Sequence, residues 1–130
     1  MQETRRIRAL IYSSTLEGHW RGVAVVTVAL RDAGIEVIYG GPLTPEQAAN
    51  TAIQEDVDVV GVSVGGRYHV VEKMLALLGE EGQRPLVIAG GTIAPPDIPV
   101  LKAMGVDEVF PPGSRLDAIV DYIKDNVPVV

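Results

Sequence analysis

The sequence contains no cysteine, few aromatic residues and no hydrophobic run long enough to cross a membrane. Without cysteine, disulfides, thiolate metal sites and cysteine nucleophiles are excluded, and we expect a reducing, cytoplasmic compartment. The first eight residues carry three arginines, but no apolar stretch of the length of a signal peptide or membrane helix follows them. We therefore expect a soluble protein with no membrane partner.

Positive charge is also scarce. The chain has 17 acidic and 11 basic residues and a net charge of −6, which excludes nucleic acid as a partner because a phosphate backbone requires clustered Lys and Arg. With only one Phe and one Trp, the hydrophobic 47% is mainly Val, Ile, Leu and Ala, as in a parallel sheet covered on both faces. A length of 130 residues predicts one domain, residues 1–130.

Short apolar segments alternate with helical patterns along the whole chain. The predicted strands are 7–12, 35–39, 57–62, 86–89 and 107–110. The predicted helices are 22–33, 44–56, 69–79, 98–104 and a last one that begins after residue 114. This alternation predicts a flavodoxin-like, doubly wound α/β fold with a five-stranded parallel sheet, order 2-1-3-4-5, and helices on both faces.

Three helix ends carry local signals. Thr44, Pro45 and Gln47 have the pattern of a capping box with proline at the first helical position. Gly105 is expected to end the fourth helix. Ser114, which follows two prolines and a glycine, is expected to cap the last helix.

The loops after the first, third and fourth strands contain glycines and would be neighbours at one edge of the sheet. Ligands of such sheets bind at the carboxyl ends of the strands, near the point where the strand order reverses. Glycine lets the backbone approach something bulky, so these loops indicate a slot for a mostly uncharged group. The alternative is that the glycines only form tight turns.

His19 is one of two histidines and follows Glu17 by two residues in the first loop. A carboxylate that accepts a hydrogen bond from one ring nitrogen makes the other nitrogen a better metal ligand. No second histidine, cysteine or carboxylate cluster in these loops completes a metal site made of protein groups alone. A metal already held by a macrocycle needs only one axial ligand, although His19 could also be an ordinary surface histidine.

Three spaced motifs resemble the D-x-H-x-x-G, S-x-L and G-G pattern of cobalamin-binding domains. They are Glu17-Gly18-His19-Trp20-Arg21-Gly22, then Ser63-Val64-Gly65 after 40 residues, then Gly90-Gly91 after 24 more. The similarity extends over nearly the whole chain. It is greatest to the small, cobalamin-carrying chains of acyl-CoA mutases, such as methylmalonyl-CoA and 2-hydroxyisobutyryl-CoA mutase.

The resemblance implies a role for each matching residue. His19 would be the axial cobalt ligand in place of the cofactor's own base, and Glu17 would orient it. Ser63 would contact the displaced base. The cofactor-binding residues implied are Glu17, Gly18, His19, Arg21, Gly22, Ser63, Gly65, Gly90, Gly91 and Ser114. Glu17 and Gly65 depart from the family's Asp and Leu, and Trp20 stands where relatives carry a small acidic residue.

The function that the resemblance implies is the small subunit of an adenosylcobalamin-dependent acyl-CoA mutase, an isomerase that rearranges the carbon skeleton of a CoA thioester by radical chemistry. No catalytic residue is expected on this chain alone. A large, barrel-type subunit would bind the acyl-CoA, and association of the chain with itself also remains open. The alternative is a non-catalytic cobalamin sensor or carrier, or a degenerate paralogue that only binds a partner, which the departures Glu17, Trp20 and Gly65 favour.

Two further functions occur on this fold. A phosphorylation receiver needs paired acidic residues after the first strand and an aspartate after the third, and neither is present. A flavin domain needs a phosphate-binding hydroxyl loop, which Ser13-Ser14-Thr15 resembles, but Leu16 and Glu17 beside it do not suit a phosphate.

Overall fold

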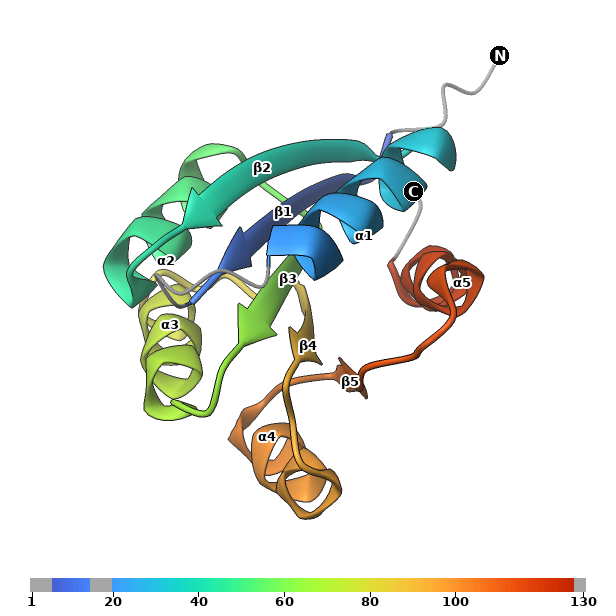
Figure 1. Ribbon diagram of the computed structural model, residues 1–130. Helices are drawn as coiled ribbons and strands as arrows, with labels where there is room; N and C mark the ends of the chain where they lie inside the picture. The colour runs from blue at the N-terminus through green and yellow to red at the C-terminus, as the bar shows by residue number, and fades with distance from the viewer. Residues whose placement is uncertain (1–5, 15–19, 128–130) are drawn as a thin grey trace.

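A computed structural model of the chain describes residues 6–14 and 20–127, and for Trp20 and Arg21 it describes the backbone only. Strands and helices alternate along these residues (Figure 1). The strands are β1 (Arg8–Ser13), β2 (Glu36–Pro42), β3 (Val59–Val64), β4 (Leu86–Gly91) and β5 (Glu108–Phe110). The helices are α1 (Trp20–Asp32), α2 (Pro45–Gln54), α3 (His69–Glu80), a 3-10 turn (Pro95–Asp97), α4 (Ile98–Met104) and α5 (Leu116–Asn126).

The five strands are parallel and lie in the order β2-β1-β3-β4-β5. Helices α2, α3 and α4 contribute their buried residues to one hydrophobic cluster, and α1 and α5 contribute theirs to another on the opposite face. The predicted flavodoxin-like, doubly wound fold and its strand order are confirmed. No helix of the described segments combines the length and the apolar character needed to traverse a bilayer.

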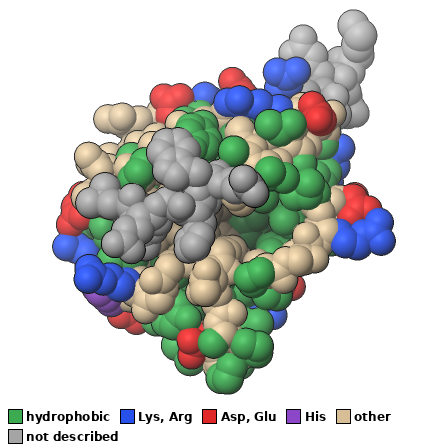
Figure 2. All heavy atoms as spheres, in the orientation of Figure 1, with side chains coloured by type: hydrophobic (Ala, Val, Ile, Leu, Met, Phe, Trp, Pro, Cys, Tyr) green, Lys and Arg blue, Asp and Glu red, His purple; other side chains and the backbone are tan. Residues whose placement is uncertain are grey.

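The central strand β3 shows why its sequence is almost entirely apolar. Val60 and Val62 face the α2, α3 and α4 layer, whereas Val59 faces α1 and α5. Because both faces of a central parallel strand are covered, alternation of polar and apolar residues is lost. Between α1 and α5 the cover is incomplete, and Figure 2 shows this surface hollowed and lined with hydrophobic side chains.

Two strands begin later than the sequence patterns predicted, each just after an aspartate. Segments 57–62 and 107–110 were expected as strands, but β3 begins at Val59 and β5 at Glu108. Asp58 Oδ2 accepts a hydrogen bond from the Arg8 amide at 2.9 Å, and Asp107 Oδ2 accepts one from the Val87 amide at 2.8 Å. In both places the aspartate side chain accepts the amide hydrogen bond that a backbone carbonyl would accept if the strand began earlier.

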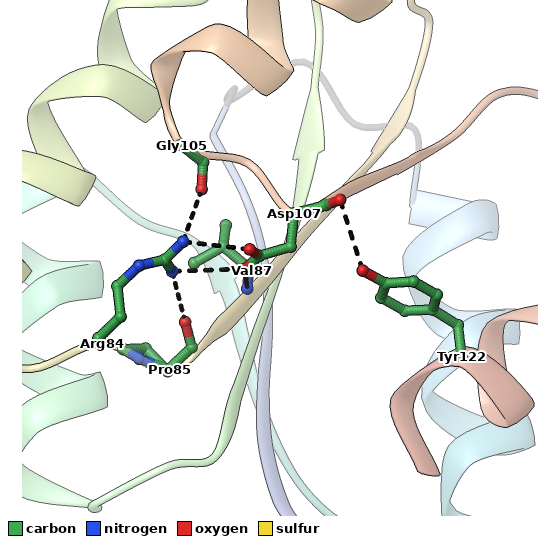
Figure 3. A network of polar contacts seen from close by, with 6 residues as sticks. All are labelled: Arg84, Pro85, Val87, Gly105, Asp107 and Tyr122. Atoms are coloured by element: carbon green, nitrogen blue, oxygen red, sulfur yellow. Dashed lines mark hydrogen bonds and ion pairs between the residues drawn. The ribbon is translucent and has the colours of Figure 1, made fainter. Parts of the chain in front are cut away.

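Asp107 is also the centre of a wider polar network (Figure 3). The Arg84 guanidinium donates to both carboxylate oxygens of Asp107, at 3.1 and 3.3 Å, and to the carbonyl oxygens of Pro85 and Gly105. From α5, the Tyr122 hydroxyl donates to the Asp107 carbonyl at 3.4 Å. The network therefore joins the start of β4, the start of β5 and α5.

Replacing Asp107 with alanine is expected to destabilise the protein substantially. The buried Val87 amide would lose its side-chain acceptor, which costs about 1–3 kcal/mol and lowers the melting temperature by roughly 4–10 °C. Thermal unfolding followed by circular dichroism measures the change. Asp125→Ala, at an exposed position of α5, is the matched control and should not lower the melting temperature; equal melting of both variants would contradict the role given to Asp107.

The predicted helix ends met different outcomes. The capping box is confirmed, because Thr44 Oγ1 accepts from the Gln47 amide at 3.1 Å and Gln47 Oε1 accepts from the Thr44 amide at 3.0 Å. Gly105 ends α4 with a φ of +119°, as predicted. The cap assigned to Ser114 was wrong: Arg115 is the N-cap of α5, and Ser114 Oγ instead donates to the Pro111 carbonyl at 2.6 Å.

Candidate functional site

A pocket of about 380 Å³ opens between α1 and α5 at the carboxyl half of the sheet (Figure 2). Its floor is formed by residues of β1, β3 and β4, one wall by the first turns of α1, and the other by β5, the turn 111–114 and the start of α5. The pocket thus lies on the face that only two helices cover, and it extends from the predicted switch point between β1 and β3 as far as β5.

A glycine in the middle of β3 gives the pocket its depth. Gly61 lies between Ile11 and Ile88 on the floor. A Cβ at position 61 would come within 2.7 Å of Ile11 Cδ1, so a larger residue would push the isoleucine into the pocket. Glycine inside a strand weakens it and often marks such a close approach.

Two glycines end β4, and the backbone conformation requires glycine at only one of the two positions. Gly90 pairs with Ser63 and Gly91 with Val64, so both belong to the sheet rather than to the loop in which the sequence placed them. Gly91 has a φ of +106°, and a Cβ there would lie 2.6 Å from the Val64 carbonyl oxygen. A Cβ on Gly90 would meet only the Phe110 carbonyl oxygen, at 3.4 Å. The backbone itself therefore requires Gly91.

Gly22 lines the pocket from the first turn of α1, and no local feature of the fold requires it. A Cβ there would have no atom within 4 Å, and its φ is not positive. Glycine in a helix lowers stability relative to alanine by roughly 0.5–1 kcal/mol. The absence of a side chain at Gly22 leaves open space next to the pocket, and it lowers the stability of the helix slightly.

The opposite wall contains Phe110 and the turn that ends at Ser114. The Phe110 ring packs edge-on against Tyr122 of α5, with ring centroids 5.8 Å apart. Ser114 donates its amide and hydroxyl to the Pro111 carbonyl, which closes the turn. Contacts between Phe110 and α5 and hydrogen bonds within the turn 111–114 therefore hold this wall in place.

The pocket lining is apolar and uncharged. Among the described residues that form it, only Ser63, Thr92 and Ser114 have polar side chains, and none is ionisable. A flat, mostly apolar group with a few hydrogen-bonding atoms suits such a lining, whereas an anion would find no charged partner among the described lining residues. Within segments 6–14 and 20–127, no three His, Cys, Asp or Glu side chains gather to hold a metal ion.

The described end of the first loop is tied to the pocket. Ser14 donates both its amide, at 3.0 Å, and its hydroxyl, at 2.9 Å, to the carbonyl oxygen of Ser63. Ser63 itself lines the pocket. The chain therefore leaves β1 beside the mouth of the pocket before it enters residues 15–19.

The structure brings together five of the ten predicted cofactor-binding residues around this pocket. These are Gly22, Ser63, Gly90, Gly91 and Ser114. Gly65 is exposed in the loop after β3 and does not line the pocket. Arg21 is the second residue of α1, and Glu17, Gly18 and His19 lie outside the described residues.

The sequence analysis missed the residues that give the pocket its shape. Gly61, Ile11 and Ile88 form the floor, and Phe110 forms part of the far wall. The one signal in the sequence was Gly61, a glycine inside an otherwise Val-rich strand. The isoleucines carry no signal, because strand residues that line a pocket and strand residues that fill a core have the same composition.

Comparison with known proteins gives a family match over most of the chain. The B12 binding domain matches residues 7–121. The chain is 48% identical to the 2-hydroxyisobutanoyl-CoA mutase small subunit of Aquincola tertiaricarbonis, over 93% of this chain and 92% of that subunit. It is 39% identical to the pivalyl-CoA mutase small subunit of Xanthobacter autotrophicus, over 92% of this chain and 83% of that one.

The same similarity extends to one segment of longer enzymes. The chain is 36% identical to human mitochondrial methylmalonyl-CoA mutase over 132 aligned residues, which are 17% of that enzyme. Among solved structures, a cobalamin-binding protein from Desulfitobacterium hafniense superposes with a TM-score of 0.81 at 18% identity, over 95% of this chain and 60% of that one. A response regulator from Thermotoga maritima gives 0.74 at 16% identity, over 93% and 97% of the two chains. These two likenesses show the fold alone.

Proposed function

The chain belongs to the B12 binding domain family, and we propose that it is the cobalamin-binding small subunit of an adenosylcobalamin-dependent acyl-CoA mutase. The relatives that it matches over most of their length are mutase small subunits, which supports the assignment. We place it in the cytoplasm, on the absence of cysteine from the sequence.

The observation that carries the proposal is the apolar pocket between α1 and α5. Its volume of about 380 Å³ and uncharged lining suit the benzimidazole end of a cobalamin tail. Gly22 leaves space at one wall, although the local fold does not require glycine there. Gly61 lets Ile11 lie deeper in the floor than a larger residue would allow. Ser63 and Ser114 supply hydroxyl groups at opposite sides. The lining residues therefore fit this part of the cofactor.

In this proposal His19 would coordinate cobalt, and the pocket would receive the cofactor's own base. Glu17 would accept a hydrogen bond from the second ring nitrogen of His19 and so fix its tautomer. The link from Ser14 to Ser63 supports this assignment, because it places the start of the His19 loop beside the pocket. When bound, adenosylcobalamin supplies radical chemistry by homolysis of its cobalt–carbon bond.

The substrate would be bound by another chain. The proposed partner is a large, barrel-type subunit that carries the acyl-CoA and covers the cofactor. Two observations support it: the similar chains include small subunits by name, and in human methylmalonyl-CoA mutase the matching segment is part of a longer polypeptide. On this chain we assign cofactor binding only.

The proposal is tested by mixing the purified protein with adenosylcobalamin and recording the absorbance spectrum after gel filtration. We expect cofactor to elute with the unmodified protein and to keep the absorbance of cobalt with a lower nitrogen ligand, because an imidazole would replace the benzimidazole; in His19→Ala that absorbance should be lost. Absorbance that stays the same in His19→Ala would mean that the cofactor keeps its own base on cobalt and would favour a carrier of another type. A colourless protein peak, both alone and with a large mutase subunit, would contradict cobalamin binding and favour a degenerate paralogue.

A further inference from the structure

One hydrogen bond joins the two loops that continue from the strand ends of the pocket. The Tyr68 hydroxyl donates to Asp97 Oδ2 at 2.7 Å across 29 residues of sequence. Tyr68 ends the loop 65–68, which follows β3, and Asp97 ends the segment 92–97, which follows β4. We call these segments the β3 loop and the β4 loop, and their hydrogen bond the clasp.

The two glycines are the least anchored part of the β3 loop, because Tyr68 packs against the core and its carbonyl accepts from the Val71 and Glu72 amides. Gly65 and Gly66 are exposed, Gly66 has a φ of +89°, and no atom lies within 4 Å of the place where its Cβ would stand. Tyr68 is the N-cap of α3, yet its side chain makes no capping bond and reaches the other loop instead. The Tyr68 ring packs against the core cluster, and this packing fixes the position of its hydroxyl.

The β4 loop is better anchored. Ile93 is 4% exposed and belongs to the same core cluster as Val64 and Val71. The Asp97 amide donates to the Ala94 carbonyl at 2.8 Å within the 3-10 turn. The clasp therefore attaches a glycine-rich loop to a segment that the core already holds in place.

The clasp is a hydrogen bond from a phenol to a carboxylate. Such charge-assisted bonds are shorter and stronger than neutral ones. The bond to Asp97 also raises the pKa of Tyr68 above its ordinary value, because loss of the phenol proton would place two negative charges side by side. Asp97→Asn would keep an acceptor oxygen at this place, whereas Asp97→Ala would remove it.

We propose that Tyr68 and Asp97 are positioning residues for the corrin ring, and that their clasp fixes the β3 loop as one edge of the corrin seat. The inference rests on the proposed function. The tail of the ligand would enter the pocket between Ser63, Gly90 and Gly22. The corrin ring would then lie at the carboxyl ends of β3 and β4, next to the β3 loop and the β4 loop. The exposed backbone of residues 65–67 then offers amides and carbonyls to the polar rim of a corrin.

The test compares Tyr68→Phe, Asp97→Ala, Asp97→Asn and the double variant Tyr68→Phe/Asp97→Ala. Dissociation constants are measured by absorbance for adenosylcobalamin and for cobinamide, a corrinoid that lacks the nucleotide tail. We expect Tyr68→Phe and Asp97→Ala each to weaken both ligands by about fivefold, and the double variant to be no weaker than either. Asp97→Asn should stay within about twofold of the unmodified protein, because it retains an acceptor.

Tyr39→Phe is the matched control, since Tyr39 lies on the edge strand β2, away from both loops, and it should leave both constants unchanged. Unchanged binding in Tyr68→Phe, or weakening confined to adenosylcobalamin, would overturn the inference, because the clasp acts on the ring and not on the tail. Failure of the unmodified protein to bind adenosylcobalamin would instead remove the proposed function, and the clasp's role with it.

Discussion

Replacing Gly22 with leucine is expected to stabilise the protein and to weaken cobalamin binding at the same time. The helix would gain about 0.5–1 kcal/mol, or roughly 2–4 °C in melting temperature, since no atom lies within 4 Å of the new Cβ. The same side chain would stand on the pocket wall and compete with the cofactor tail, which should weaken adenosylcobalamin binding by more than about tenfold. Thermal unfolding and absorbance titration measure the two effects.

Gly79→Leu is the matched control for this variant. Gly79 is exposed in α3, and a Cβ there also has no atom within 4 Å, but the position is remote from the pocket. We expect it to leave adenosylcobalamin binding unchanged. Equal affinity in Gly22→Leu and Gly79→Leu would mean that the pocket between α1 and α5 does not receive the tail.

The second large effect is expected for His19→Ala. Loss of the imidazole should abolish axial coordination by the protein and leave the circular dichroism spectrum unchanged. The direct measurement uses protein labelled with nitrogen-15 histidine and loaded with cob(II)alamin. In its electron paramagnetic resonance spectrum, nitrogen-15 coupling to cobalt should be present in the unmodified protein and absent in His19→Ala.

Two comparisons complete this experiment. His69, the other histidine of the chain, is exposed at the start of α3, and His69→Ala should keep the nitrogen-15 coupling. Glu17→Gln should retain the coupling but weaken cofactor binding by roughly tenfold, because an orienting carboxylate acts through its histidine. Coupling that persists in His19→Ala would reject His19 as the ligand.

The fold was predictable because its signals are local or periodic. The capping box at Thr44 involves residues three apart, and the Val-rich strand around Val60 has the composition of a central parallel strand. The errors came from hydrogen bonds that form across the structure. Strands β3 and β5 begin later than predicted, just after Asp58 and Asp107, whose side chains bind amides 50 and 20 residues away. Ser114 does not cap α5, because its hydroxyl donates to the Pro111 carbonyl.

The site was predictable only in part for the same reason. The three sequence motifs correctly identified Gly22 in one wall of the pocket, and Ser63 and Gly90 at the strand ends that line it. The floor depends on Gly61 facing Ile11 across two strands, which no pattern within one segment reveals. A link between residues 29 apart, such as that of Tyr68 with Asp97, likewise appears only when the loops are seen together.

The positions of the two described ends of the chain bear on how the domain is joined to a larger assembly. Strand β1 begins at Arg8 and α5 ends at Asn126, and both points lie at the amino edge of the sheet, opposite the pocket (Figure 1). A covalent tether attached there would leave the pocket mouth uncovered while raising the local concentration of the domain beside the proposed large subunit. The same fold thus suits two genetic arrangements, a separate chain that docks by affinity and a segment fused into a longer polypeptide.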